Sequence, residues 1–333
     1  MRKAIKENLR RASAHINRVQ MHEGIPLFSH LDINPTELCN RRCNFCPRVD
    51  PNQYPNQNLN LSLQLAEKIA DELSALRYQG VVIFCGFGEP LLHPDLVRIV
   101  SCFSEAIRIE IVTSGDQLTP PVIQRFLEAG VDYFVVSMYD GPHQVDYFKN
   151  MFADAGYSEK YYVLRDRWHS DEDSFGLKLT NRAGLVSVGN QDPVDVTKPC
   201  YYPSYSMALD WNGDVLLCVQ DWNKKVKLGN IYAQSLVEVW TSALFRKYGA
   251  SLAKERRKLT PCNVCNTNGT LHGFNHIKRW REVWSRKNHL QGDVSSDSSL
   301  SSGVSSSFRT DRATESVKPY SSARVRRLNA GSR

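Results

Sequence analysis

Three cysteines with the spacing Cys-x3-Cys-x2-Cys lie in one short segment near the N-terminus. They are Cys39, Cys43 and Cys46, and they follow a short apolar run that is typical of a β-strand. Three thiolates on one loop can hold three irons of a [4Fe–4S] cluster, which leaves the fourth iron open to a cofactor or substrate. A zinc loop or three structural thiols is the alternative, although no fourth ligand lies nearby in the sequence.

Four more cysteines in the C-terminal half could form a second metal site. They are Cys200, Cys218, Cys262 and Cys265. Four protein ligands close a site, so this group predicts a structural or electron-conducting metal rather than one that binds substrate. For four cysteines considered alone, zinc is the usual metal.

A glycine-rich segment, Gly86-Phe87-Gly88-Glu89-Pro90, directly follows another apolar run. Gly86 and Gly88 allow the backbone to approach a ligand closely, and Glu89 can accept a charge-assisted hydrogen bond from an amine. Three hydroxyl residues lie at the ends of the next two expected strands: Thr113, Ser114 and Ser137. Each of these either forms an ordinary turn at a strand end or contacts the same ligand.

The elements that must position these residues alternate between short β-rich and longer helical runs. The expected strands are 31–34, 81–85, 107–113, 133–138, 161–164 and 177–180, and the expected helices are 62–78, 95–104, 119–129 and 143–155. Apolar strands joined by helices predict a parallel sheet, here an α/β fold with a partial (β/α)6 TIM-like barrel. In such barrels the chemistry gathers at the C-terminal ends of the strands.

The pattern changes after Pro199. Two strands, 205–210 and 215–218, flank Asn212-Gly213, which should supply the positive φ values of a tight hairpin turn. Helices are expected at 235–241, 243–258 and 272–286. We therefore expect four parts: a basic amphipathic helix in 1–28, a core in 29–190, a small α+β domain in 195–287, and a disordered Ser-rich tail in 288–333.

The formal net charge of +7 is confined to the two ends of the chain. Residues 1–20 carry six basic side chains and one acidic one, and residues 291–333 carry seven and four, so the body is near neutral. No nucleic-acid partner is expected. The N-terminal helix either docks on the body through its apolar stripe or makes weak contact with an anionic surface.

The sequence contains no uninterrupted apolar run of about 18 residues and no signal-like apolar region at its start, which predicts a cytoplasmic protein. Its nine cysteines are then expected to be reduced thiols. Ligand-like spacing in such a compartment indicates metal binding rather than disulfides.

The first cysteine group, with Phe45 directly before its last cysteine, resembles the radical S-adenosylmethionine (SAM) superfamily. The resemblance implies that the three cysteines hold a [4Fe–4S] cluster and that SAM chelates its open iron. It also implies that the segment 86–90 receives the SAM ammonium, and that Thr113, Ser114 and Ser137 lie near SAM. Reductive cleavage of SAM would then give a 5′-deoxyadenosyl radical that abstracts a substrate hydrogen.

The second cysteine group resembles the twitch form of the SPASM extension, which implies an auxiliary [4Fe–4S] cluster. This arrangement is similar to that of aminocyclitol dehydrogenases, and it implies oxidation of a sugar-like or cyclitol substrate, with the auxiliary cluster accepting an electron. Arg182 lies where such enzymes present a polar arginine; a salt bridge at the domain junction is the alternative. An electron donor such as flavodoxin or ferredoxin is implied.

Two other functions remain open at the level of sequence. Related enzymes crosslink or epimerise peptides, and an epimerase needs a hydrogen donor, for which Cys85 is the candidate; a buried core cysteine is the alternative. A non-catalytic metal-binding interaction protein is the third hypothesis, and the intact Cys39, Cys43, Cys46 and Glu89 argue against it.

Overall fold

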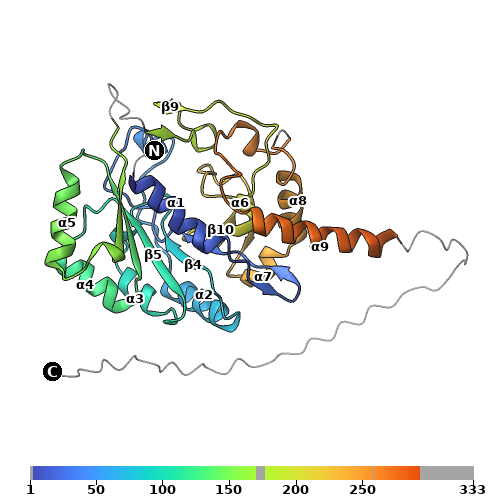
Figure 1. The fold of residues 1–333 in the computed structure, drawn as a ribbon, viewed down its shortest axis with the longest axis horizontal. Coiled ribbons are helices and arrows are strands. Elements are labelled where there is room, and N and C mark those ends of the chain that lie inside the picture. The colour runs from blue at the N-terminus through green and yellow to red at the C-terminus, as the bar shows by residue number, and fades with distance from the viewer. Residues whose placement is uncertain (1–2, 170–176, 257, 293–333) are drawn as a thin grey trace, which may run out of the picture. The chain divides into compact units, whose positions relative to one another are not determined.

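A computed structural model describes residues 3–169, 177–256 and 258–292 (Figure 1). Its centre is an eight-stranded sheet with the order β12-β11-β10-β3-β4-β5-β6-β7. The strands are β3 (His30–Ile33), β4 (Val81–Phe84), β5 (Arg108–Thr113), β6 (Tyr133–Met138), β7 (Tyr162–Asp166), β10 (Ser206–Leu209), β11 (Asp214–Leu216) and β12 (Lys227–Asn230). Strands β3 to β7 and β10 run parallel, whereas β10, β11 and β12 pair antiparallel.

Four helices connect the parallel strands and lie along the outer side of the sheet in Figure 1. They are α2 (Leu63–Ala75), α3 (Leu96–Ser101), α4 (Pro120–Ala129) and α5 (Gln144–Asp154). Helix α2 begins where the Ser62 side chain accepts a hydrogen bond from Leu65 N, and Thr119 caps α4 in the same way. Helix α4 ends at Gly130, whose φ of 114° only glycine adopts readily.

The inner face of the sheet carries polar as well as apolar side chains, whereas the outer face is apolar. In β3, Leu31 and Ile33 are fully buried, whereas His30 and Asp32 alternate with them and remain partly exposed. A parallel sheet that curves around a polar interior and is covered by helices on the other side is a partial TIM-like barrel. The predicted fold class is therefore confirmed.

The sixth parallel strand differs from the prediction. Residues 177–180 contain only the two-residue β8 (Lys178–Leu179), which pairs with β9 (Asn190–Gln191) in a separate sheet. Strand β10 takes the sixth position beside β3. All four residues of β10 are buried, as a strand inside the sheet requires, whereas Lys178 is exposed.

The hairpin after Pro199 is present, with a longer turn than expected. Leu209 pairs with Val215, so Asp210–Asp214 lies between them. Within the Asn212-Gly213 pair, Gly213 alone has a positive φ, of 81°. The positive φ expected for both residues is therefore found only at Gly213, and the Asn212 side chain instead accepts a hydrogen bond from Asp214 N at 3.1 Å.

The remaining helices pack beside β10 to β12. They are α6 (Tyr202–Tyr205), α7 (Leu236–Trp240), α8 (Ala243–Leu252) and α9 (Phe274–Gly292). The 3-10 turns are Pro47–Val49, Pro90–Leu92, Glu159–Tyr161, Arg182–Gly184 and Cys262–Val264. Helix α9 extends beyond residue 287, where the tail was expected to begin, and residues 293–333 lie outside the described part. None of the described helices has both the length and the apolar character that a membrane span requires.

The N-terminal helix α1 (Lys3–Ile16) docks on the body. Its Arg11 forms an ion pair with Glu110, a fully buried residue of β5, and Ile16 is buried. The short hairpin β1 (Met21–His22) and β2 (Ile25–Pro26) follows it. Docking, one of the two functions expected for this helix, is thus what the structure shows.

Candidate active site

One large cavity, with a volume of about 510 Å³, opens inside the partial barrel. It is lined by twelve of the residues that the sequence pointed to: Cys39, Cys43, Phe45, Cys46, Cys85, Gly86, Gly88, Glu89, Thr113, Ser114, Ser137 and Arg182. Pro90 does not line it; this residue is buried and begins the 3-10 turn that follows Glu89. Segments far apart in the sequence therefore converge on one space large enough for a small-molecule ligand.

The loop with the first cysteines packs tightly against the glycine-rich segment. The Asn34 side-chain oxygen accepts hydrogen bonds from Phe87 N at 3.0 Å and Gly88 N at 3.3 Å. A Cβ atom at Gly88 would lie 2.1 Å from the Thr36 carbonyl oxygen. Glycine is thus required at position 88 by contact between two loops, which is a structural reason beyond ligand approach.

Glu89 is buried at the edge of the cavity and is already hydrogen-bonded. It accepts from Thr113 Oγ1 at 2.6 Å, from Ser114 N at 2.8 Å and from Leu91 N at 3.2 Å. Burial raises the pKa of Glu89, while the hydrogen bonds from Ser114 and Thr113 oppose that rise. A carboxylate has about four acceptor sites, so it retains capacity for a cationic group from the cavity.

Two arginines at the end of β7, Arg165 and Arg167, also line the cavity. Neither was predicted from the sequence. Arg165 Nη2 donates to Ser137 Oγ at 2.7 Å. Burial, followed by the charge of Arg167, lowers the pKa of Arg165 to about 9. Their place in the sequence could have indicated them, since charged residues at the C-terminal end of a barrel strand are typical of catalytic positions. Such cations suit an anionic group of a ligand.

Arg41 fixes the first cysteine loop to the ends of two strands. Its guanidinium donates to Asp116 at 2.5 and 2.6 Å and to Asp140 at 2.7 Å. These carboxylates follow β5 and β6, and the Arg41 guanidinium also lies 5.2 Å from the ring centre of Tyr139. Bidentate pairs of this kind hold a loop in one orientation, so the Cys39–Cys46 segment is anchored between its first two cysteines.

Phe45 belongs to the same loop and packs against residues outside it. Its ring lies 6.0 Å from Tyr139 in a stacked arrangement and 5.7 Å from His169 edge-on. The side chain is buried and still contributes to the cavity wall. It therefore combines packing of the loop with an apolar surface beside Cys46.

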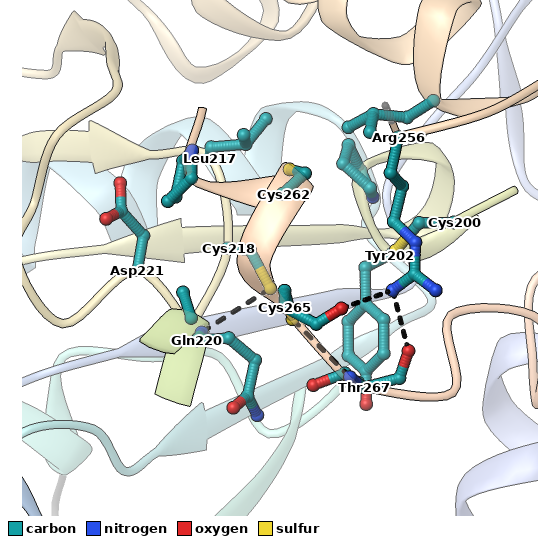
Figure 2. A pocket seen from close by; sticks show the side chains of 14 residues that line it. Cys200, Tyr202, Leu217, Cys218, Gln220, Asp221, Arg256, Cys262, Cys265 and Thr267 are labelled. Carbon is teal, nitrogen blue, oxygen red and sulfur yellow. Dashed lines mark hydrogen bonds between the residues drawn. The ribbon is translucent and has the colours of Figure 1, made fainter. Parts of the chain in front are cut away.

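The second cysteine group lines a smaller, separate pocket (Figure 2). Cys200 precedes α6, Cys218 follows β11, and Cys262 and Cys265 lie at the short turn before α9. Figure 2 shows Arg256 donating to the carbonyl oxygens of Cys265 and Thr267, at 3.3 and 2.9 Å. This buried arginine also donates to the carbonyl oxygens of Asp195 and Lys198, so it joins the segment before Cys200 to the segment around Cys265.

Backbone amides point at two of these sulfurs. Gln220 N donates to Cys218 Sγ and Thr267 N to Cys265 Sγ, each at 3.5 Å. Burial raises the pKa of Cys200 to about 11 and that of Cys262 to about 12, so these thiols require a bound metal to become thiolates. Amide donors toward sulfur tune and stabilise metal-bound thiolate.

Both cysteine groups suit iron–sulfur clusters by their chemistry. All nine cysteines are free thiols. Within the described ranges, no three His, Cys, Asp or Glu side chains meet closely enough to hold a single metal ion. Three thiols on the wall of the large cavity and four around the smaller pocket match the thiolate ligands of iron–sulfur clusters. The first group lines the large cavity, and the second lines the smaller pocket.

Arg182 and Cys85 both face the large cavity. Arg182 lies 3.5 Å from Gln220 Oε1 and 5.8 Å from the ring centre of Trp222, and its φ of 47° is unusual for a residue with a side chain. The Cys85 thiol donates to Asp32 Oδ1 at 3.7 Å, and burial raises its pKa well above the usual value. It is therefore a neutral thiol on the cavity wall.

Two family models match the chain in the regions of the two cysteine groups. The radical SAM superfamily matches residues 33–162, and the iron-sulfur cluster-binding domain called SPASM matches residues 200–266. Together with the site described above, these matches show that the chain belongs to the radical SAM superfamily and carries a SPASM-like domain. Its cofactors are SAM and [4Fe–4S] clusters.

Individual relatives narrow the class to radical SAM oxidoreductases. The chain is 29% identical over 256 residues to the S-adenosyl-L-methionine-dependent 2-deoxy-scyllo-inosamine dehydrogenase of Niallia circulans, a match that covers 72% of this chain and 93% of the relative. The crystal structure of BtrN with AdoMet and 2-DOIA is 28% identical with a TM-score of 0.63, over 75% of this chain and 98% of that one. BtrN in an open conformation is 25% identical with a TM-score of 0.54, over 72% and 93%.

Proposed function

We propose that this protein is a radical SAM dehydrogenase that oxidises one hydroxyl group of an aminocyclitol to a ketone. The observation that carries the proposal is the shared wall between the two sites. Tyr202, Gln220 and Thr267 line both the large cavity and the pocket of the second cysteine group. A substrate in the cavity would therefore lie beside the auxiliary cluster that removes its second electron.

The first cysteine group, Cys39, Cys43 and Cys46, would hold the SAM-binding cluster. The second group would hold the auxiliary cluster: Cys200, Cys218, Cys262 and Cys265. When bound and reduced, the first cluster and SAM supply a 5′-deoxyadenosyl radical that removes hydrogen from an unactivated C–H bond. The protein's own contribution is to bind, orient and shield the reactants.

Opposite charges on two walls of the cavity would orient SAM. Glu89, held by Thr113 and Ser114, would accept hydrogen bonds from the ammonium group of SAM. Arg165, held against Ser137, would bind the SAM carboxylate. Gly86 and Gly88 would let the backbone approach the SAM ammonium group, since neither residue carries a side chain.

Arg182 and Gln220 would bind substrate hydroxyl groups. They lie on the side of the cavity nearest the second cysteine group, and Thr180 Oγ1 donates to Gln220 Oε1 at 3.1 Å. An amide and a guanidinium together offer several donors to a polyhydroxylated ring. This arrangement favours a cyclitol over an apolar substrate.

We further propose that a small one-electron carrier, such as a flavodoxin or ferredoxin, reduces the first cluster. Cluster potentials of this type require a low-potential donor.

The proposal is tested by anaerobic incubation with dithionite, SAM and a panel of cyclitols and aminocyclitols, with analysis of the products. We expect 5′-deoxyadenosine and a ketone in a ratio of about one to one for the true substrate. The Cys43→Ser variant should form neither product, because one iron ligand of the first cluster is lost. Cleavage of SAM without any ketone from the whole panel would overturn the substrate class.

A further inference from the structure

One carboxylate in the large cavity has no role in the scheme above. Asp32 lies in the middle of β3, between Ile83 of β4 and Ala208 of β10 in register. It points to the inner side of the sheet, remains partly exposed there, and lines the cavity. Leu31 and Ile33 on either side of it point the other way, into the apolar layer.

The contacts of Asp32 are all to neutral groups. Ser206 Oγ donates to Asp32 Oδ2 at 2.6 Å, and Cys85 Sγ donates to Oδ1 at 3.7 Å. Among the described residues, no Lys, Arg or His lies within 4.0 Å of its carboxylate. Glu110, two strands away, is by contrast paired with both Arg11 and Arg108.

A carboxylate that is largely removed from water and has no cation beside it is costly, and such groups cluster at functional sites. Burial raises the pKa of Asp32 to about 6, with the hydrogen bonds from Ser206 and Cys85 acting in the opposite sense. At neutral pH the group is therefore mostly ionised and is a stronger base than an ordinary aspartate. A pKa close to the working pH is what proton transfer requires.

Tyr202 lies on the wall shared by the large cavity and the second cysteine group. Its side chain lines both the large cavity and the cysteine pocket, as Figure 2 shows for the latter. A substrate in the cavity that Asp32 lines would thus share the Tyr202 wall with the auxiliary cluster site.

We infer that Asp32 is the catalytic proton acceptor in the oxidation of the substrate alcohol. The inference rests on the proposed dehydrogenase function. The substrate carbinol C–H bond breaks and gives its hydrogen atom to the SAM-derived radical. The hydroxyl O–H bond of the substrate radical then breaks, its proton goes to Asp32, one electron goes to the oxidised auxiliary cluster, and the C=O bond forms.

Removal of the base should separate hydrogen abstraction from product formation. In Asp32→Asn, with 2-deoxy-scyllo-inosamine deuterated at its ring carbons, we expect 5′-deoxyadenosine to carry deuterium as in the wild type. The ketone formed per 5′-deoxyadenosine should fall at least tenfold, and a substrate carbon radical should accumulate in the electron paramagnetic resonance spectrum. Asp32→Glu should restore part of the ketone, because it restores the carboxylate.

Matched measurements keep a structural effect apart from a catalytic one. The exposed Asp71→Asn in α2 is the charge-matched control and should behave as the wild type. Iron content and the Kd of the unreduced enzyme for the aminocyclitol should change less than threefold in Asp32→Asn.

Three results would overturn the inference. A wild-type ratio of ketone to 5′-deoxyadenosine in Asp32→Asn would show that another group takes the proton. Loss of aminocyclitol binding in Asp32→Asn would make Asp32 a recognition residue. Absence of deuterium transfer in the wild type would instead defeat the proposed function, and the inference with it.

Discussion

The carboxylate of Glu89 is oriented before any ligand arrives, because three donors already hold it. Thr113 and Ser114 were expected to form strand-end turns or to contact SAM directly, and the structure places both against Glu89. Preorganised acceptors bind a cation without the cost of reorganisation. Both residues also line the cavity, and we propose that they position Glu89, which would receive the SAM ammonium.

Thr113→Val tests this positioning. The variant keeps the shape of the side chain and removes the hydroxyl that donates to Glu89 at 2.6 Å. A charge-assisted hydrogen bond contributes about 1.5 kcal/mol or more, so we expect SAM to bind roughly tenfold more weakly. Equilibrium binding of SAM to the reconstituted enzyme measures the effect, with the exposed Thr270→Val as control. Unchanged affinity in Thr113→Val would refute the role.

Asp32 should also make the stability of the protein depend on pH. Its folded pKa of about 6 lies above the ordinary 3.8, so the folded state holds the proton more tightly. The contribution of Asp32 to the free energy of unfolding is then most favourable below pH 3.8. It falls by at most about 3 kcal/mol as the pH rises to 6. The titratable groups around Asp32 are Cys85, Glu110, Tyr78, Tyr202 and Tyr205.

The measurement is the Tm of the apoprotein at pH 5 and pH 8. Asp32→Asn should melt higher than the wild type at pH 8 and show a smaller advantage at pH 5, because the wild-type carboxylate is neutral there. An equal difference at both pH values would mean that the pKa of Asp32 is not raised.

Between elements, a buried ionic network connects the first cysteine loop to the SPASM-like part. Glu37, two residues before Cys39, accepts from Arg48 at 2.8 Å and from Lys224 at 2.5 Å. Lys224 also pairs with Asp210 at 2.6 Å. Because these residues come from the loops after β3 and around β11, the network fixes the two parts of the site relative to each other.

Lys224→Met should break this connection. Removal of one partner leaves Glu37 and Asp210 buried with fewer cations, which typically costs 3 to 5 kcal/mol, and we expect about 3 because Lys224 is partly exposed. Chemical denaturation of the apoprotein measures the free energy of unfolding. The exposed neighbour Lys225→Met is the matched control and should have little effect. Similar stability of both variants would show that the network contributes nothing.

The helices and strands were predictable where the local hydrophobic pattern determines them. The site was predictable where it depends on the spacing of cysteines along the chain. The strand 133–138 appears with the predicted bounds because its six residues are buried and apolar or small. The sixth strand was misplaced because pairing of β10 with β3 depends on tertiary contact across more than 170 residues. Arg165 and Asp32 were not predicted as site residues for the same reason. A single polar residue in an apolar strand can be assigned to a site only when the curvature of the sheet shows that it lines the cavity.

For the whole molecule, the account predicts two separate clusters with different tasks. After anaerobic reconstitution the wild type should hold about eight irons per chain. Cys262→Ser should keep about four irons and still cleave SAM, since the first cysteine group is untouched, while ketone formation is lost. Cys43→Ser should also keep about four irons but cleave no SAM. Iron analysis and 5′-deoxyadenosine assays check both variants, and loss of all iron in either one would contradict independent clusters.

Wild-type enzyme with ring-deuterated 2-deoxy-scyllo-inosamine offers the most direct test of the central claim, that the cavity brings one substrate C–H bond to the SAM-derived radical. The measurement is the mass of the 5′-deoxyadenosine formed with dithionite and SAM. The account predicts one deuterium atom in each molecule and an equal amount of ketone. Unlabelled 5′-deoxyadenosine, formed at the same rate with and without the aminocyclitol, would contradict it.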